Sequence, residues 1–334
     1  MRNSLYVIGL GISLVSCGSQ NNTKKVVATP KPITTAQPII PIKPPIKQEE
    51  ADFYKVNIGD ITKNDNTISY GSIVAAKPNH YKVVKTYFPA VAQNFRQRYV
   101  ILHYTALDND KSASVLTQQS VSAHYLVNSY DDNEIYLLVD ENKRAYHAGV
   151  SNWRADQNLN DISIGIEIVN AGWTTNATGT KIFPGFPEKQ IKKVANLVKD
   201  IASRYNIPPT NILAHSDIAP TRKQDPGPMF PWKRLYDEYQ IGMWYDDATK
   251  LAFLNSMTQE DLLAQYNTPQ FIYKIQTALN KFGYKLDSTT VWDKQTKQTI
   301  EAFQYHFRPE KTDGILDLET WAILQALMQK YPTK

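Results

Sequence analysis

The stretch Ala214–Trp232, AHSDIAPTRKQDPGPMFPW, contains one histidine, two aspartates, a basic pair and four prolines in nineteen residues. Proline lacks the amide hydrogen that helices and central strands need, so this density of prolines predicts a shaped loop. Loops on a rigid scaffold are where catalytic residues gather. His215 and Asp225 lie ten residues apart here and are able to converge on one metal ion. A hydrolytic zinc site needs three protein ligands, so the third must come from another part of the chain.

The composition is that of a globular protein with an unusual N-terminus. The chain has 334 residues, which favours two folded units, and its hydrophobic content is 42%. The net charge is +5, but residues 1–50 hold six basic and two acidic residues and account for most of it. The rest of the chain is nearly neutral, which argues against a nucleic-acid-binding protein.

The first residues predict a targeting segment. Arg2 precedes the apolar run Leu5–Val15, which is too short to cross a membrane. The run ends in LVSC at residues 14–17, which resembles a bacterial lipobox. The resemblance implies cleavage before Cys17 and acylation of that residue, which would anchor the protein stably in a membrane. An ordinary secretion signal that happens to contain cysteine is the alternative.

Cys17 is the single cysteine of the sequence, which excludes disulfides within the chain and cysteine zinc ligands. Gly18 follows it, as is common in outer-membrane lipoproteins, so we expect a protein of the cell envelope that is anchored in the outer membrane and faces the periplasm. Residues 18–51 are rich in lysine, threonine and proline, which predicts a disordered tether after the signal segment 1–17.

Residues 52–240 alternate strand and helix patterns, which predicts an α/β domain with a mixed central sheet and flanking helices. Strands are expected at 98–104, 122–128, 134–140, 163–170 and 212–215, the second and third as a hairpin. The first of them is almost continuously apolar, as in a buried strand. An amphipathic helix is expected over 187–205.

The C-terminal part predicts a second unit. Segment 241–268 carries no usable motif and is expected to connect the two units, partly as helix. Residues 269–331 contain three apolar stripes at helical spacing, which predict a small three-helix bundle with its own core. Asp293 and Asp317 stand where helix N-caps are expected.

A candidate third ligand is His103, because it ends the first buried strand and is held at a rigid edge. With His215 and Asp225 it would complete a His/His/carboxylate zinc site. Asp217 is the alternative carboxylate, although we expect it to hold the loop by local hydrogen bonds. His124 lies in mid-strand and is interpreted as a core or second-sphere histidine.

Two charged residues complete this hypothesis. Glu167 shares a strand face with glycine and valine, a costly place for an isolated carboxylate. Beside a metal ion it would act as a general base. Lys223 lies two residues before Asp225 and would stabilise an oxyanion, or only neutralise an acidic loop.

Five segments, VILHYTA, VSAHYLV, AYHAGVSNW, SIGIEIVN and HSDIAPTRKQDPGPMFPW, in this order resemble the zinc-dependent N-acetylmuramoyl-L-alanine amidases of the Amidase_2 group, the AmiD-type lipoproteins in particular. The resemblance covers roughly residues 80–235. It implies the fold of peptidoglycan-recognition proteins and zinc (Zn²⁺) ligation at the positions of His103, His215 and Asp225. It also implies a catalytic carboxylate at Glu167 and assistance at the oxyanion from Lys223.

The resemblance implies hydrolysis of the amide between the lactyl group of N-acetylmuramic acid and the L-alanine of the stem peptide. Glu167 would take a proton from water and pass it to the leaving amine, while Lys223 and zinc hold the oxyanion. His147 and Trp153 flank a glycine-containing loop, where hydrogen bonding to a sugar and stacking on it compete with simple loop packing. The other two histidines, His80 and His306, have a structural interpretation only.

The tail carries a second resemblance. IQTALNKFGY, TIEAFQYHFRP and TDGILDLETWAIL are similar to the three-helix peptidoglycan-binding module that is often attached to cell-wall hydrolases. The residues LDSTT at 286–290 replace the usual glycine-rich turn, which bears on the affinity of the module more than on its fold. The expected partners are therefore peptidoglycan and muropeptides, with a membrane contact through Cys17 and no evident protein partner.

Two alternatives to the amidase remain open at the level of the sequence. The first is a peptidoglycan-binding lipoprotein without activity, against which the complete set of metal ligands argues. The second is a zinc endopeptidase that cuts within the stem peptide. The new amino terminus of the product distinguishes it from an amidase, which would release L-alanine.

Overall fold

The computed structural model describes residues 78–81, 92 and 94–333. The predicted signal segment, the lipidation residue Cys17 and the predicted tether lie outside the described residues. Within the described part, no helix combines the length and the apolar character needed to cross a membrane.

A five-stranded sheet forms the centre of the fold, in the order β3-β2-β6-β1-β9. Its strands are β1 (Tyr99–Tyr104), β2 (Tyr125–Val127), β3 (Tyr136–Leu137), β6 (Ser163–Ile168) and β9 (Ile212–Ala214). β3 runs antiparallel to β2, and the other neighbours pair in parallel. The predicted mixed sheet and its hairpin are confirmed.

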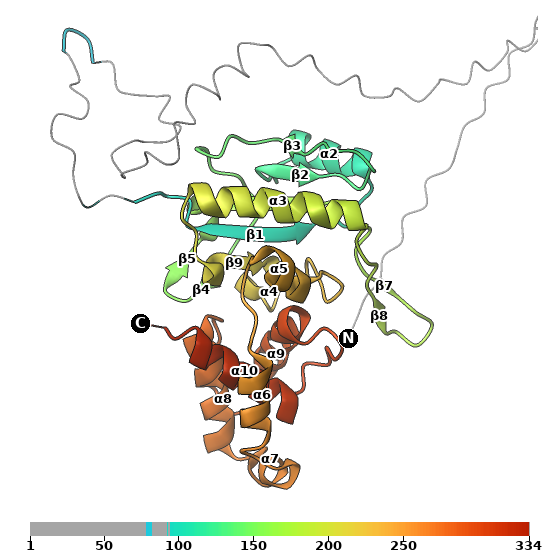
Figure 1. The fold of residues 1–334 in the computed structure, drawn as a ribbon, viewed down its shortest axis with the longest axis vertical. Coiled ribbons are helices and arrows are strands. Elements are labelled where there is room, and N and C mark those ends of the chain that lie inside the picture. The colour runs from blue at the N-terminus through green and yellow to red at the C-terminus, as the bar shows by residue number, and fades with distance from the viewer. Residues whose placement is uncertain (1–77, 82–91, 93, 334) are drawn as a thin grey trace, which may run out of the picture. The chain divides into compact units, whose positions relative to one another are not determined.

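Helices cover the two faces of this sheet. α3 (Glu188–Arg204) runs across β1 and β2 (Figure 1). Its buried side chains, among them Ile191, Val194 and Val198, join the cluster that contains the isoleucines of β6. α2 (Asn109–Gln118), which was not predicted from the sequence, covers the other face through Leu116, which packs near Leu126.

Alternation along β6 assigns its residues to these two faces. Ile164, Ile166 and Ile168 belong to the α3 face, so Gly165 and Glu167 belong to the other, because successive side chains of a strand point in opposite directions. This face carries the polar side chains that the sequence singled out.

The fold also contains several short elements. They are β4 (Asn152–Trp153) with β5 (Asp156–Gln157), β7 (Thr174–Thr175) with β8 (Lys181–Ile182), and the 3₁₀ helices η2 (Leu159–Asp161) and η3 (Pro209–Asn211). The proline-rich loop opens with a single helical turn, α4 (His215–Ile218), and ends where α5 (Trp232–Tyr239) begins.

The C-terminal part is helical throughout (Figure 1). Its helices are α6 (Asp247–Leu254), α7 (Gln259–Gln265), α8 (Pro269–Phe282), α9 (Lys294–Phe307) and α10 (Leu318–Lys330). The last three lie where the apolar stripes predicted helices. Asp293 and Asp317 cap α9 and α10, since each side chain accepts a hydrogen bond from the amide three residues later. α6 lies in the predicted connecting segment but packs on α10, so we describe α6–α10 together as the helical module.

The core of the helical module is continuous with that of the sheet domain. One continuous cluster of buried side chains runs from the sheet into the module. The Trp153 ring of β4 meets the Phe282 and Tyr284 rings edge to face, at 5.9 Å and 5.2 Å between centroids. Gly283 allows this approach, because a Cβ there would lie 2.6 Å from the indole of Trp153. The module is therefore packed into the sheet domain.

Candidate active site

The candidate site lies at the carboxyl ends of three neighbouring parallel strands, where ligands bind in open α/β sheets. His103 is on β1, and Glu167 stands beside it on β6 as its Cα partner in the register. His215 follows directly after β9, which flanks β1 on the other side. The sheet thus brings together residues that are up to 112 positions apart in the chain.

The atoms of His103, His215 and Asp225 converge on one point. The two Nδ1 atoms lie 2.9 Å apart, and they lie 3.0 Å and 2.9 Å, respectively, from Oδ2 of Asp225. The three candidate ligand atoms are all within 4.8 Å of one another, and all three residues are buried.

The hydrogen bonds of His215 fix its tautomer. Its Nε2 atom lies 3.1 Å from the carbonyl oxygen of Ala148. A carbonyl only accepts, so Nε2 carries the hydrogen and, in the neutral ring, Nδ1 has the lone pair. Arg222 donates to the same carbonyl at 2.7 Å, which holds this acceptor in place.

A chain of hydrogen bonds fixes the tautomer of His103 in the same sense. The Ser163 hydroxyl donates to the carbonyl of Leu159, so its oxygen accepts from Nε2 of His147 at 3.1 Å. Nδ1 of His147 therefore has the lone pair that accepts from Nε2 of His103 at 3.0 Å. Nδ1 of His103 is consequently without hydrogen.

Two imidazole lone pairs and a carboxylate oxygen thus face one another with no hydrogen among them. Burial and the neighbouring His215 ring lower the pKa of His103 to about 4, so its ring is neutral. Such a set repels itself unless a cation lies between its members, and two histidines with a carboxylate suit zinc. The residues present fit the metal.

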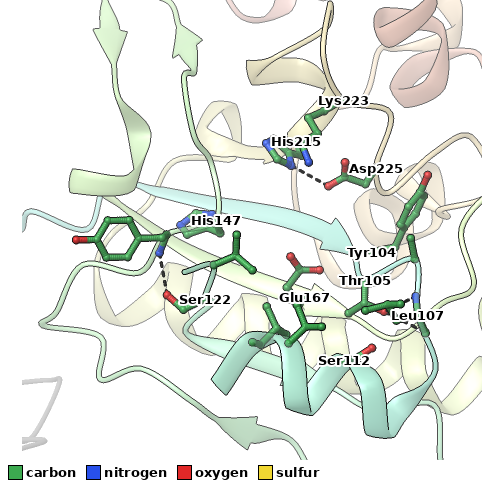
Figure 2. A pocket seen from close by; sticks show the side chains of 15 residues that line it. Tyr104, Thr105, Leu107, Ser112, Ser122, His147, Glu167, His215, Lys223 and Asp225 are labelled. Carbon is green, nitrogen blue, oxygen red and sulfur yellow. Dashed lines mark hydrogen bonds and ion pairs between the residues drawn. The ribbon is translucent and has the colours of Figure 1, made fainter. Parts of the chain in front are cut away.

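A cavity of about 240 Å³ opens beside this group and is lined by Tyr104, Glu167, Lys223 and Asp225, among others. Figure 2 shows Glu167 on one side of it, facing Asp225, His215 and Lys223 on the other. The Oε2 atom of Glu167 is buried and has no hydrogen-bond partner within the described residues. Burial, and to a lesser extent Asp225, raise the pKa of Glu167 to about 8, with Lys223 opposing the shift.

Two predictions of substrate contact need correction. The side chain of Trp153 is 0% exposed, and its indole nitrogen donates to the carbonyl of Thr210, so it offers no face for stacking on a sugar. His147 lines the cavity, but both of its ring nitrogens are bonded within the protein. It holds His103 and has no nitrogen free for a sugar.

The other polar candidates have the structural roles that were expected. Asp217 accepts from the amide of Ala214 and lies outside the converging group. His124 accepts from the amide of Gly165 and donates to the carbonyl of Lys143, which occupies both ring nitrogens.

Several supporting residues were missed. Ser163 ends the chain of hydrogen bonds to His103, and Asn160 accepts from the amides of His147 and Ala148. Gly165 leaves room for the His147 ring, since a Cβ there would lie 2.3 Å from the ring carbon Cγ. The motif AYHAG pointed to this region, but nothing local in the sequence marks Ser163 or Asn160 as partners of a histidine.

Comparison with known proteins identifies the family of this chain. The family model described as N-acetylmuramoyl-L-alanine amidase matches residues 93–228. The chain is 42% identical over 243 residues to the N-acetylmuramoyl-L-alanine amidase AmiD of Escherichia coli, covering 71% of this chain and 84% of that protein. The chain belongs to the N-acetylmuramoyl-L-alanine amidase family. A peptidoglycan binding domain model matches residues 268–324, within the helical module.

Two solved structures are similar over most of the chain. One is AmiD of Escherichia coli in complex with anhydro-N-acetylmuramic acid-L-Ala-D-gamma-Glu-L-Lys, with a TM-score of 0.68 and 39% identity over 77% of this chain and 98% of that chain. The other is AmpDh3 of Pseudomonas aeruginosa in complex with anhydromuramic pentapeptide, with a TM-score of 0.65 and 41% identity over 78% of this chain and 100% of that chain. Both similarities extend beyond the family match into the helical module.

Proposed function

We propose that His103, His215 and Asp225 hold a zinc ion in a hydrolytic site where Glu167 is the general base and Lys223 stabilises the oxyanion. As a member of its family, the chain hydrolyses the amide between the lactyl group of N-acetylmuramic acid and the L-alanine of peptidoglycan stem peptides. The observation that carries the proposal for the metal is the convergence of three buried lone pairs without a hydrogen among them.

When bound, zinc supplies a Lewis acid that polarises a carbonyl and makes water more acidic. Glu167 takes a proton from the attacking water and returns one to the nitrogen of the leaving L-alanine. Its unpaired Oε2 atom is available to bind that water. Burial makes Glu167 a stronger base than an exposed carboxylate, and a nearby cation opposes this rise of its pKa.

Lys223 supplies a positive charge on the side of the cavity that faces Glu167 (Figure 2). An ammonium group in that position stabilises negative charge as it develops on the carbonyl oxygen of the scissile amide. His147 contributes by holding Nε2 of His103, so that Nδ1 stays free of hydrogen and keeps its orientation.

We further propose that anhydro-muropeptides are among the substrates, because two similar proteins were solved in complex with such molecules. The peptidoglycan binding domain match indicates that the chain acts in the cell envelope. Anchoring in the outer membrane through a lipidated Cys17 is a proposal that rests on the motif LVSC. Replacing Cys17 with serine should move the protein from the membrane fraction to the soluble fraction of the envelope. Unchanged membrane association of this variant would overturn the anchor.

The decisive experiment is mass spectrometry of purified sacculi after digestion with the protein, with and without a chelator. We expect free stem peptides that begin with L-alanine, lost on chelation and restored by zinc. Products that begin with another residue would instead identify an endopeptidase. Sacculi that stay intact but retain the protein would identify a binding protein.

A further inference from the structure

Helix α4 presents His215 at its first position and buries Asp217 two residues later. The Asp217 side chain is fully buried, and its Oδ2 atom accepts a hydrogen bond from the amide of Ala214 at 2.8 Å. This bond closes the turn from which His215 points into the cavity. The orientation of the Asp217 carboxylate and that of His215 are therefore coupled through one backbone turn.

The other two hydrogen bonds of this carboxylate come from the helical module. The hydroxyl of Tyr284 donates to Oδ1 at 2.7 Å, and Nδ1 of His306 lies 2.7 Å from Oδ2. They follow Asp217 in the chain by 67 and 89 positions, respectively, and both side chains are buried. His306 and the Ala214 amide thus share one carboxylate oxygen.

Packing fixes both donors. The Tyr284 ring lies edge to face against Trp153, and the His306 ring stacks on Trp232 with centroids 3.9 Å apart and planes 19° apart. Trp232 begins α5, which ends the loop that carries Asp225. α4 and α5 both pack against α9, which carries His306. The module therefore contacts both ends of the loop that supplies two of the three candidate ligands.

We propose that Tyr284 and His306 are positioning residues of the metal site, which act through Asp217 on the turn that presents His215. The inference rests on the proposed ligation by His215, and it gives the helical module a role in catalysis besides peptidoglycan binding. A buried carboxylate is costly unless donors satisfy it, so the three donors together determine its orientation. Loss of one donor lets the carboxylate turn and loosens the turn that it closes. Removing a group that bonds directly to a metal ligand typically weakens metal binding 10- to 100-fold, and Tyr284 and His306 act one step further away, so we expect an effect at the lower end of that range.

The test uses Tyr284→Phe in the full chain, because this change removes the hydroxyl and keeps the ring against Trp153. We expect about tenfold weaker zinc affinity in competition with a chelator, a lower kcat and an unchanged KM. The matched control is Tyr305→Phe. Its hydroxyl also bonds to a carboxylate, that of Glu301, and contacts Lys181 of the sheet domain at 3.4 Å, but it does not touch Asp217. This control should keep the zinc affinity of the parent.

A second pair of variants guards against a general loss of stability. His306→Asn keeps an N–H donor near the position of Nδ1, whereas His306→Leu removes it, and both lose the stacking on Trp232. We expect the asparagine variant to bind zinc more tightly than the leucine variant, which packing alone does not predict. Retention on sacculi should be the same for both, because this readout follows the module surface and not the metal.

The outcomes separate this inference from the proposed function. If the parent protein binds zinc and Tyr284→Phe matches it within twofold, the module only packs against the site and the inference is wrong. The same holds if Tyr305→Phe weakens zinc binding as much as Tyr284→Phe does. If the parent itself binds no zinc, the proposed metal site fails, and the positioning role fails with it.

Discussion

The two faces of strand β6 are built from alternate residues of one hexapeptide and serve different purposes. Ile164, Ile166 and Ile168 are 0% exposed and pack in the cluster that includes α3. Gly165 and Glu167 face the other way, where one leaves room for a histidine ring and the other stands beside the cavity. The isoleucine face contributes stability through buried apolar area. The other face buries the Glu167 carboxylate, which is energetically unfavourable but places a base beside the cavity. Successive side chains of a strand point to opposite faces, so the packing residues and the polar site residues lie on different sides of β6.

The largest effect is expected from removing the base on the β6 face that carries Gly165 and Glu167. Glu167→Gln keeps the size of the side chain and removes the base, so we expect kcat on muropeptides to fall on the order of 1,000-fold. Zinc content should be unchanged, and stability should not fall, because Oε2 has no hydrogen-bond partner to lose. Kinetics, metal analysis and thermal unfolding of the same preparation check this. A variant that retains more than a tenth of the parent activity would remove Glu167 from the mechanism.

A smaller effect is expected at Gly165, where the absence of a side chain makes room for the His147 ring. Gly165→Ala places a methyl group 2.3 Å from Cγ of His147, so the ring must move and His103 loses its partner. We expect zinc affinity to fall about 10- to 100-fold, with a loss of stability of about 1–3 kcal/mol. Chelator competition and urea unfolding measure the two quantities.

The matched control for this variant is Gly185→Ala. It makes the same chemical change at an exposed position with no atom within 4 Å of the added carbon. We expect no change in zinc affinity. Equal losses in both alanine variants would mean that the effect at Gly165 is a general one of the backbone and does not act through His147.

The smallest effect is expected on the isoleucine face of β6. Ile166→Val removes one buried methylene and should lower the free energy of unfolding by about 1 kcal/mol, with kcat and zinc affinity within twofold of the parent. Urea unfolding and steady-state kinetics check this. A tenfold loss of kcat would show that the two faces of β6 are coupled and do not act independently.

Much of the fold could be predicted because its signals are local. The apolar run of β1, the alternation in β6 and the helical spacing in α3 each occupy one short segment, and each was located to within a few residues. α2 was missed because its apolar stripe is thin, with Leu116 as its one large buried side chain. The continuity of the module's core with that of the sheet was not predicted, because the Trp153 contact with Phe282 joins segments 129 positions apart.

Burial, which the local sequence does not reveal, decides the role of Trp153. Trp153 flanks a glycine-containing loop, where stacking on a sugar and simple loop packing were both open from the sequence. In the structure it fills the junction between the sheet and the helical module. No local pattern distinguishes a tryptophan that packs from one that binds, since the difference lies in what another part of the chain places against it.

The sequence by itself determined the chemical inventory of this protein. It supplied the prolines that shape a loop, the histidines and carboxylate suited to zinc, and Glu167 on a strand face that it shares with glycine and valine. Tertiary structure alone decided which nitrogen of each histidine is free of hydrogen, because the deciding acceptors are Ala148 and His147, which are 67 and 44 positions away from His215 and His103. It also decided that Asp217 is held by the helical module. Residue types are local properties of a chain, whereas hydrogen-bond partners exist only after the chain has folded.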